Sequence, residues 1–138
     1  MIGLDTNVLA RYYIDDAGDA EAVRQRSAAR RLIESGQPLM VAKTVVLELE
    51  WVMRGYYGFT PPEVGSVLKH LLGLRHVTLE DREAIEQALV NGDAGVDFAD
   101  ALHHASYKAC ESVATFDDRK FARRARKLGM TPAITIPK

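Results

Sequence analysis

The chain has 138 residues, of which 47% are hydrophobic and 27% are charged. This length and apolar content predict one folded domain, exclude intrinsic disorder and leave no need for a disulfide or structural metal. No apolar run approaches the ~20 residues of a membrane-spanning helix, the single cysteine excludes an intramolecular disulfide, and the start lacks a secretory signal, so we expect a cytoplasmic protein. The net charge of −1 hides an asymmetry, because the first 118 residues hold 11 basic and 19 acidic residues, whereas the last twenty hold seven basic residues and no acidic one.

The first half of the chain alternates short apolar runs with helical patterns. Residues 2–5 predict a buried strand that ends in a polar turn, and residues 8–13 predict a short helix. A longer helix is expected at residues 20–35, where alanine and arginine are frequent. It is followed by a second strand at residues 39–41 and a helix at residues 44–54.

The second half continues this alternation. Thr60 followed by two prolines is typical of a helix start. Beyond that helix we expect strands at residues 76–79, 112–116 and 131–136, and helices at residues 80–91, 98–110 and 118–128. Short apolar strands separated by helices predict the α/β class, with a parallel sheet covered by helices. Ligands bind at the carboxyl ends of the strands in such sheets, so candidate site residues are sought there.

Carboxylates follow two of the predicted strands. Asp5 ends the first predicted strand, and Asp117 directly follows the strand predicted at residues 112–116. Both are therefore expected at the carboxyl edge of one parallel sheet. Asp100 lies in the first turn of its predicted helix. Each acid also has a simpler explanation, since Asp5, Asp97, Asp100 and Asp117 could each cap or begin a helix.

A glutamate is predicted on an apolar helix face. Glu48 falls on the face formed by Val45, Leu49 and Val52, whereas Glu50 is predicted to point away from it. A carboxylate on such a face is costly unless it is paired, and its partner could be an arginine such as Arg11, a protonated neighbour or a metal ion. Convergence of the acids would raise their pKa values unless a divalent cation neutralised them, and ligation by oxygen alone favours Mg²⁺ or Mn²⁺.

Other reactive side chains give weaker signals. Asp100 and His104 have an i,i+4 spacing that could hold a metal, but for His103 and His104 we expect solvation or a hydrogen bond. Cys110 follows the core side of its helix, which predicts a small buried side chain rather than a nucleophile. Packing between helices or across a dimer, rather than stacking on RNA, is predicted for Trp51, Tyr56 and Tyr57.

Four segments resemble, in order, the motifs of PIN-domain nucleases. They are residues 2–9 (IGLDTNVL), 46–53 (VLELEWVM), 97–102 (DFADAL) and 114–117 (ATFD). Their order and spacing are similar to those of VapC-type toxins of bacterial type II toxin–antitoxin pairs. The resemblance implies that residues 1–138 form a single PIN-like α/β/α sandwich, with a central, mainly parallel sheet of about four or five short strands flanked by helices.

The resemblance also implies the site and its chemistry. The acidic quartet that binds Mg²⁺ or Mn²⁺ and carries catalysis is implied at Asp5, Glu48, Asp100 and Asp117. Polar residues that support this site are implied at Thr6, Asn7, Asp97, Thr115 and Asp118. The intact quartet implies an endoribonuclease that hydrolyses phosphodiester bonds with a metal-activated water, on tRNA or another structured RNA.

Partners follow from the same resemblance. It implies a homodimer and a small VapB-like antitoxin that blocks the acidic pocket, with DNA contacted only through the antitoxin and no membrane contact. The last helix could hold RNA phosphates through Arg119, Lys120, Arg123, Arg124, Arg126 and Lys127. The alternative is that this helix is a solvated outer face.

Two other functions fit the sequence. The acidic pocket could capture a basic antitoxin peptide in a regulatory binding module without catalysis, which the charge asymmetry of the chain favours. A housekeeping PIN nuclease in RNA processing or repair is the third hypothesis, although the chain shows no added RNA-binding domain.

Overall fold

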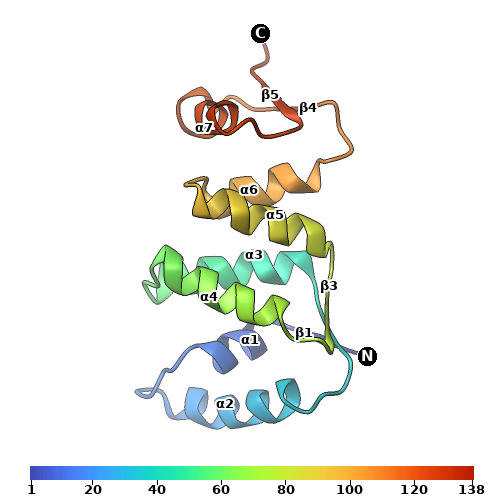
Figure 1. Cartoon of the computed structure of the whole chain (residues 1–138). Coiled ribbons are helices and arrows are strands. Elements are labelled where there is room, and N and C mark those ends of the chain that lie inside the picture. Colours follow the sequence, from blue (N-terminus) through green and yellow to red (C-terminus); the bar gives the residue numbers. More distant parts are fainter. The chain divides into compact units, whose positions relative to one another are not determined.

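The computed structural model describes residues 1–138, and its elements follow the predicted alternation of strands and helices (Figure 1). The chain divides into two compact units, Met1–Arg82 and Glu83–Lys138. Every strand pairing is parallel, which confirms the expected α/β class. The strands form one sheet of three in the first unit and one of two in the second. The single-domain assignment stays a prediction.

The first unit is built on the sheet β1-β2-β3. Its strands are β1 (Ile2–Leu4), β2 (Leu39–Val41) and β3 (Val77–Leu79), aligned so that Gly3 faces Met40 and Met40 faces Thr78. The helical segments are α1 (Thr6–Tyr13), α2 (Ala20–Ile33), α3 (Lys43–Trp51), the π-helical turn η1 (Val52–Tyr56) and α4 (Pro61–Leu72).

Local sequence signals explain where these helices begin. The Asp19 carboxylate accepts hydrogen bonds from the backbone of Glu21 and Ala22 at the start of α2. Thr60 and Glu63 form a reciprocal capping box at the start of α4, as the Thr-Pro-Pro pattern predicts. The core of the unit comes from fully buried side chains on β2 and the helices: Leu9, Ile33, Leu39, Val46, Leu49, Met53, Leu68 and Leu71.

The second unit contains the parallel pair β4 (Ser112–Ala114) and β5 (Ala133–Thr135), in which Val113 faces Ile134. Its helical segments are α6 (Phe98–Ser106), the π-helical turn η2 (Asp118–Ala122) and α7 (Arg123–Lys127); helix α5 (Arg82–Asp93) begins at the boundary of the units. None of the helices in the structure has the length and apolar character needed to cross a lipid bilayer.

Two helices of the second unit differ from the sequence predictions. Helix α6 ends at Ser106 rather than at residue 110, because its last turn tightens: the backbone N–H of Tyr107 donates to the carbonyl of His104, three residues before it. Cys110 therefore lies beyond the helix and is exposed, so the prediction of a buried cysteine was wrong. The basic helix predicted at residues 118–128 begins as a π-helical turn and continues as α7.

Candidate functional site

A pocket of about 430 Å³ opens in the first unit and is called the first pocket below. Parts of α1, the loop after it, α3 and η1 form its walls. Its lining residues are Asp5, Thr6, Asn7, Ala10, Arg11, Asp16, Asp19, Glu48, Trp51, Val52, Tyr56 and Tyr57. Asp5 and Glu48, predicted as catalytic acids from segments 43 positions apart, thus line the same pocket, together with the predicted supporting residues Thr6 and Asn7.

Asp5 directly follows β1 and caps α1. Its Oδ1 accepts a hydrogen bond from the backbone N–H of Thr6 at 2.8 Å, so one carboxylate oxygen is tied to the helix start. The Thr6 hydroxyl beside it is buried and has no hydrogen-bond partner within the protein. A buried hydroxyl without a partner is uncommon. The start of α1 could therefore accommodate a ligand that binds to the Thr6 hydroxyl oxygen.

The two glutamates of α3 exchange the roles predicted for them. Glu48 is exposed and lines the first pocket, whereas Glu50 is buried at 3% exposure. The prediction that Glu48 lies on the apolar face was therefore wrong. The buried stripe of α3 and η1 consists of Val46, Leu49, Glu50 and Met53, so the apolar face is centred beside the one inferred from Val45 and Val52.

Arg54 explains why Glu50 tolerates burial. The Arg54 Nε donates to both carboxylate oxygens of Glu50, at 2.9 and 3.3 Å, from four residues further along the chain. The charge of Glu50 is thereby compensated. Glu48 does not form an ion pair with Arg11, whose Nε donates instead to Gln25 on α2.

The first pocket also contains polar residues that were not predicted to belong to the site. The Tyr57 hydroxyl donates to the Asp16 carboxylate at 3.1 Å. Burial, this hydrogen bond and the charge of Asp16 raise the pKa of Tyr57, while the nearby Arg11 acts in the opposite direction. The acidic residues and glycine at residues 15–19 lie between the two helices predicted at residues 8–13 and 20–35.

A second pocket, of about 930 Å³, lies wholly within the second unit. It joins the loop before α6, the start of α6, η2 and α7. Its lining residues are Ala94, Gly95, Val96, Asp97, Asp100, Asp117, Arg119, Lys120, Phe121, Arg123, Arg124, Lys127 and Leu128. The other two predicted catalytic acids, Asp100 and Asp117, therefore lie in one pocket with five of the six basic residues that were predicted to hold RNA phosphates. The sixth, Arg126, is not among the lining residues.

Backbone hydrogen bonds hold the acids of the second pocket in place. Asp97 caps α6 by accepting from the backbone N–H of Asp100 at 3.1 Å. Asp117 caps η2 by accepting from the backbone N–H of Lys120 at 3.0 Å, and its own N–H donates to the Thr115 hydroxyl at 3.0 Å. Asp97 and Thr115 thus hold the backbone of Asp100 and Asp117 in place. Their role in support of a catalytic site stays a prediction.

The pKa of Asp100 is affected by burial and by the neighbouring carboxylates. Burial raises its pKa above the ordinary value, and the charges of Asp97 and Asp117 raise it further, while His103 acts in the opposite direction. A bound cation would offset the repulsion between these carboxylates, which is one of the causes of the raised pKa.

The strand before Asp117 ends at Ala114 rather than at residue 116, so Asp117 follows it after a short turn.

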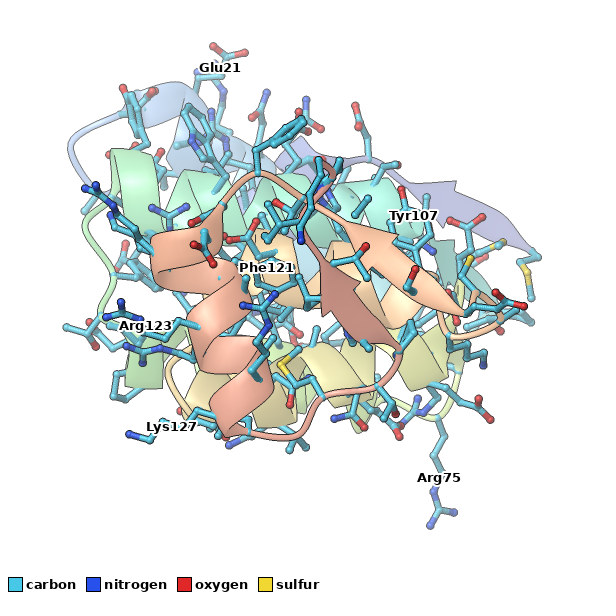
Figure 2. All side chains as sticks on the ribbon, turned by 90° about the horizontal axis from the view of Figure 1, so that it is seen from above. Glu21, Arg75, Tyr107, Phe121, Arg123 and Lys127 are labelled. Carbon is cyan, nitrogen blue, oxygen red and sulfur yellow. The ribbon has the colours of Figure 1, made fainter.

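The basic residues of the second pocket are available to a ligand. None of Arg119, Lys120, Arg123, Arg124 and Lys127 makes an ion pair. Figure 2 shows Arg123 and Lys127 projecting from the same side of the helix, away from the buried Phe121. Arg126 is different, because it pairs with Asp118 at 3.4 Å. This ion pair gives Asp118 a structural partner at the outer side of η2.

Two further features shape this unit. Gly95 has a positive φ of 102°, and the Arg124 guanidinium occupies the space where a Cβ would stand, so the arginine lies directly over this glycine. His104 is buried and its Nε2 forms a 2.7 Å hydrogen bond with the Pro132 carbonyl oxygen, whereas His103 is exposed. The expectation of a solvated or hydrogen-bonded state is confirmed for both histidines.

The donor chemistry of both pockets suits a hard divalent cation. Carboxylate and hydroxyl oxygens are the ligands that Mg²⁺ and Mn²⁺ prefer, and the pockets offer no cysteine. Within either unit no group of three or more His, Cys, Asp or Glu side chains is arranged as a metal site on its own. The partnerless Thr6 hydroxyl and the raised pKa of Asp100 are the two observations that fit a bound cation.

Comparison with known proteins adds one match. Residues 2–127 match the PIN domain family, a range that includes all four predicted catalytic acids and every residue lining the two pockets except Leu128. A search of curated proteins gave no significant match.

Proposed function

Because the chain belongs to the PIN domain family, a superfamily of metal-dependent nucleases, we propose that it is a Mg²⁺- or Mn²⁺-dependent endoribonuclease. Asp5, Glu48, Asp100 and Asp117 are the acids proposed to bind the metal and carry catalysis. Thr6, Asn7, Asp97, Thr115 and Asp118 are proposed to support them.

One observation carries the choice of a nucleic-acid substrate. The second pocket combines the carboxylates of Asp100 and Asp117 with five basic side chains that have no ion-pair partners. A polyanion needs such cations beside an acidic centre, since the carboxylates alone would repel its phosphates. Arg119, Lys120, Arg123, Arg124 and Lys127 are therefore proposed to bind phosphates on either side of the cleaved bond.

The bound cation and the surrounding residues are proposed to have different roles in hydrolysis. When bound, a divalent cation lowers the pKa of the attacking water and stabilises the developing charge on the phosphate. Asp5 and Asp117 present carboxylate oxygens from capped helix starts, where the hydrogen bonds to Thr6 and Lys120 limit their motion. The Thr115 hydroxyl accepts from the Asp117 backbone and fixes the turn that carries it.

The finer proposal is that the enzyme is the toxin of a toxin–antitoxin pair. The four motifs that resemble VapC-type toxins support it. It predicts a cytoplasmic homodimer, a VapB-like antitoxin that occupies the acidic pocket, DNA contact only through that antitoxin, and tRNA or another structured RNA as the target. Growth arrest on induced expression, relieved by an Asp5→Asn variant, is the expected result; normal growth would favour a housekeeping nuclease in RNA processing or repair.

One feature favours the second candidate, a regulatory binding module. The first pocket holds the four carboxylates of Asp5, Asp16, Asp19 and Glu48 against one arginine, so a basic peptide fits its charge. Such a module would bind an antitoxin peptide and cleave nothing.

The decisive experiment is cleavage of total RNA and purified tRNA by protein freed of any antitoxin, with Mg²⁺, Mn²⁺ or EDTA in parallel. Asp5→Asn keeps an oxygen that accepts from Thr6, so it tests chemistry without removing the helix cap. Asp15→Asn is the matched control, because Asp15 lies outside the pocket and pairs with Arg26. Metal-dependent cleavage that only Asp5→Asn abolishes is expected. Equal cleavage by Asp5→Asn would point to a contaminating ribonuclease and contradict the proposal.

A further inference from the structure

Two large aromatic side chains in the first pocket are exposed rather than buried in the core. Trp51 ends α3 with 58% of its surface exposed, and Tyr56 ends η1 with 75% exposed. Both line the first pocket with Asp5 and Glu48. Of the two kinds of packing predicted for these aromatics, packing between helices of this chain is not observed for Trp51 and Tyr56, and packing across a dimer stays a prediction. Aromatic side chains normally gain stability by burial, so two exposed rings at one pocket need another explanation.

The indole of Trp51 is held in a defined position. A Cβ placed on Gly55 would lie 3.5 Å from the indole Cε2 and Nε1, so the ring lies against the bare backbone of Gly55 one turn later. Gly55 belongs to the π-helical turn η1. Turns of this kind occur frequently at functional sites, because the extra residue redirects the side chains that follow.

The ring of Tyr56 packs against the ring of Tyr57. The Tyr57 ring meets the Tyr56 ring edge to face, with centroids 4.9 Å apart and planes at 69°. Tyr57 is in turn fixed by its hydrogen bond to Asp16. The exposed tyrosine thus stands against an anchored neighbour, which reduces the entropy lost when a ligand packs on it.

We propose that Trp51 and Tyr56 form a stacking platform for an unpaired nucleobase of the substrate, next to Asp5 and Glu48 in the first pocket. This inference rests on the proposed nuclease function and makes the substrate a single strand, or a strand with a base turned out of its stack. Stacking on aromatic rings contributes about 1–3 kcal/mol per base and tolerates any base.

The charges around the platform favour a base over the alternatives. Four carboxylates and one arginine line the pocket, so in the absence of a bound cation a phosphate is disfavoured there. The same carboxylates accept hydrogen bonds from the N–H groups at a base edge. A second copy of this chain that buried Trp51 and Tyr56 would be expected to meet a continuous apolar patch, whereas these rings stand among charged side chains.

Trp51 is the chain's single tryptophan, so its fluorescence reports on the platform directly. Protein in EDTA is titrated with hexauridylate RNA, with an abasic oligomer of the same length and with a blunt RNA duplex. We expect saturable quenching by hexauridylate, and neither the abasic oligomer nor the duplex is expected to quench. Affinities from the anisotropy of labelled hexauridylate should fall about tenfold in Trp51→Ala and in Tyr56→Ala.

Controls separate stacking from folding. Trp51→Phe keeps an aromatic ring and should retain most of the affinity. Tyr107→Ala removes an exposed tyrosine of the second unit, labelled in Figure 2, and should leave the affinity unchanged. Circular dichroism of each variant checks the fold. If Trp51→Ala fails to fold, Tyr56→Ala alone decides the question.

Three outcomes would overturn the platform: equal binding of the abasic oligomer, unchanged affinity in Tyr56→Ala, or loss of self-association in both alanine variants with RNA affinity intact. The last would make this face an interface between copies of the chain. The nuclease proposal is tested separately, since cleavage with Mg²⁺ and unchanged affinity in the variants would refute only the platform. Quenching without any metal-dependent cleavage would refute only the nuclease.

Discussion

The two pockets surround their carboxylates with different neighbours. In the first pocket Asp5 and Glu48 lie among aromatic rings, with one arginine present. In the second pocket Asp100 and Asp117 lie among five basic side chains. Each pocket contains a carboxylate that caps a helix start through a backbone hydrogen bond, Asp5 in the first and both Asp97 and Asp117 in the second. The common feature is the placement of carboxylate oxygens. The difference lies in the part of a nucleotide that each pocket is proposed to bind: a base in the first and a phosphate in the second.

The largest expected effect separates the two glutamates of α3. Glu48→Gln should lower RNA cleavage about 100-fold or more, because it removes a proposed metal-binding carboxylate, and should change unfolding by no more than ~0.5 kcal/mol, since Glu48 is exposed. Glu50→Gln should retain cleavage and lose about 1–3 kcal/mol of stability, since it weakens a buried charged pair with Arg54. Cleavage assays and urea unfolding measure both. Loss of activity in Glu50→Gln alone would exchange the roles assigned here.

A smaller effect is expected from the basic residues of the second pocket. The double variant Arg123→Gln with Lys127→Gln should weaken binding of single-stranded RNA about tenfold at low salt, and should reduce the slope of log affinity against log salt by about 1.4. Arg75→Gln is the control, because Arg75 is an exposed arginine of the first unit that projects freely in Figure 2. An unchanged slope in the double variant would mean that α7 is only a solvated face.

The support of Arg124 can be tested at Gly95. Gly95→Ala should cost about 1–2 kcal/mol of stability, because alanine is strained at a φ of 102° and its methyl group would displace the Arg124 guanidinium. Gly92→Ala, within α5 and with open space around it, should instead be neutral or stabilise the protein by about 0.5 kcal/mol. Thermal unfolding compares them. Equal stability of the two variants would show that Arg124 does not depend on Gly95.

The smallest expected effect concerns Tyr57 in the first pocket. Its pKa in the folded protein is raised above the ordinary value of 10.0. The protonated phenol therefore adds stability that is fully present below pH 10 and is lost as the pH rises through the folded pKa. Asp16→Asn should lower the pKa of Tyr57, because it removes a charge that opposes the phenolate. The tyrosinate absorbance of Tyr57→Phe, subtracted from that of the parent, isolates this titration; an unchanged pKa would contradict the link to Asp16.

Much of the fold could be predicted from the sequence. Strands of three residues were located because each is a short apolar run bounded by a turn or a helix signal, as at Leu39–Val41. Helix starts were found where capping residues are explicit, as at Thr60. Helix ends were less accurate: nothing in the sequence around Ser106 marks the tightened last turn of α6, and so Cys110 was placed on a helix that does not reach it.

The acids of the candidate site were found by their position after strands and at helix starts, but their surroundings were not. The choice between Glu48 and Glu50 depends on the rotation of α3, and an error of one position in the apolar stripe exchanges the two. The pairing of Glu50 with Arg54 at i,i+4 spacing was a readable signal. The association of Trp51, Tyr56 and Asp16 was not readable, because the π-helical turn that brings the aromatics to the pocket has no sequence signature of its own.

Because of the π-helical turn η1, the position of Tyr56 depends on the number of residues between α3 and α4. A π-helical turn amounts to one extra residue inserted into a regular helix. Deleting a single residue from Val52–Tyr56 would let α3 continue as an ordinary helix, and every later side chain would rotate by about 100° around its axis. Tyr56 would then leave the first pocket, although no residue that contacts Asp5 or Glu48 had been replaced. In this segment, an insertion or deletion would alter the site more than most substitutions.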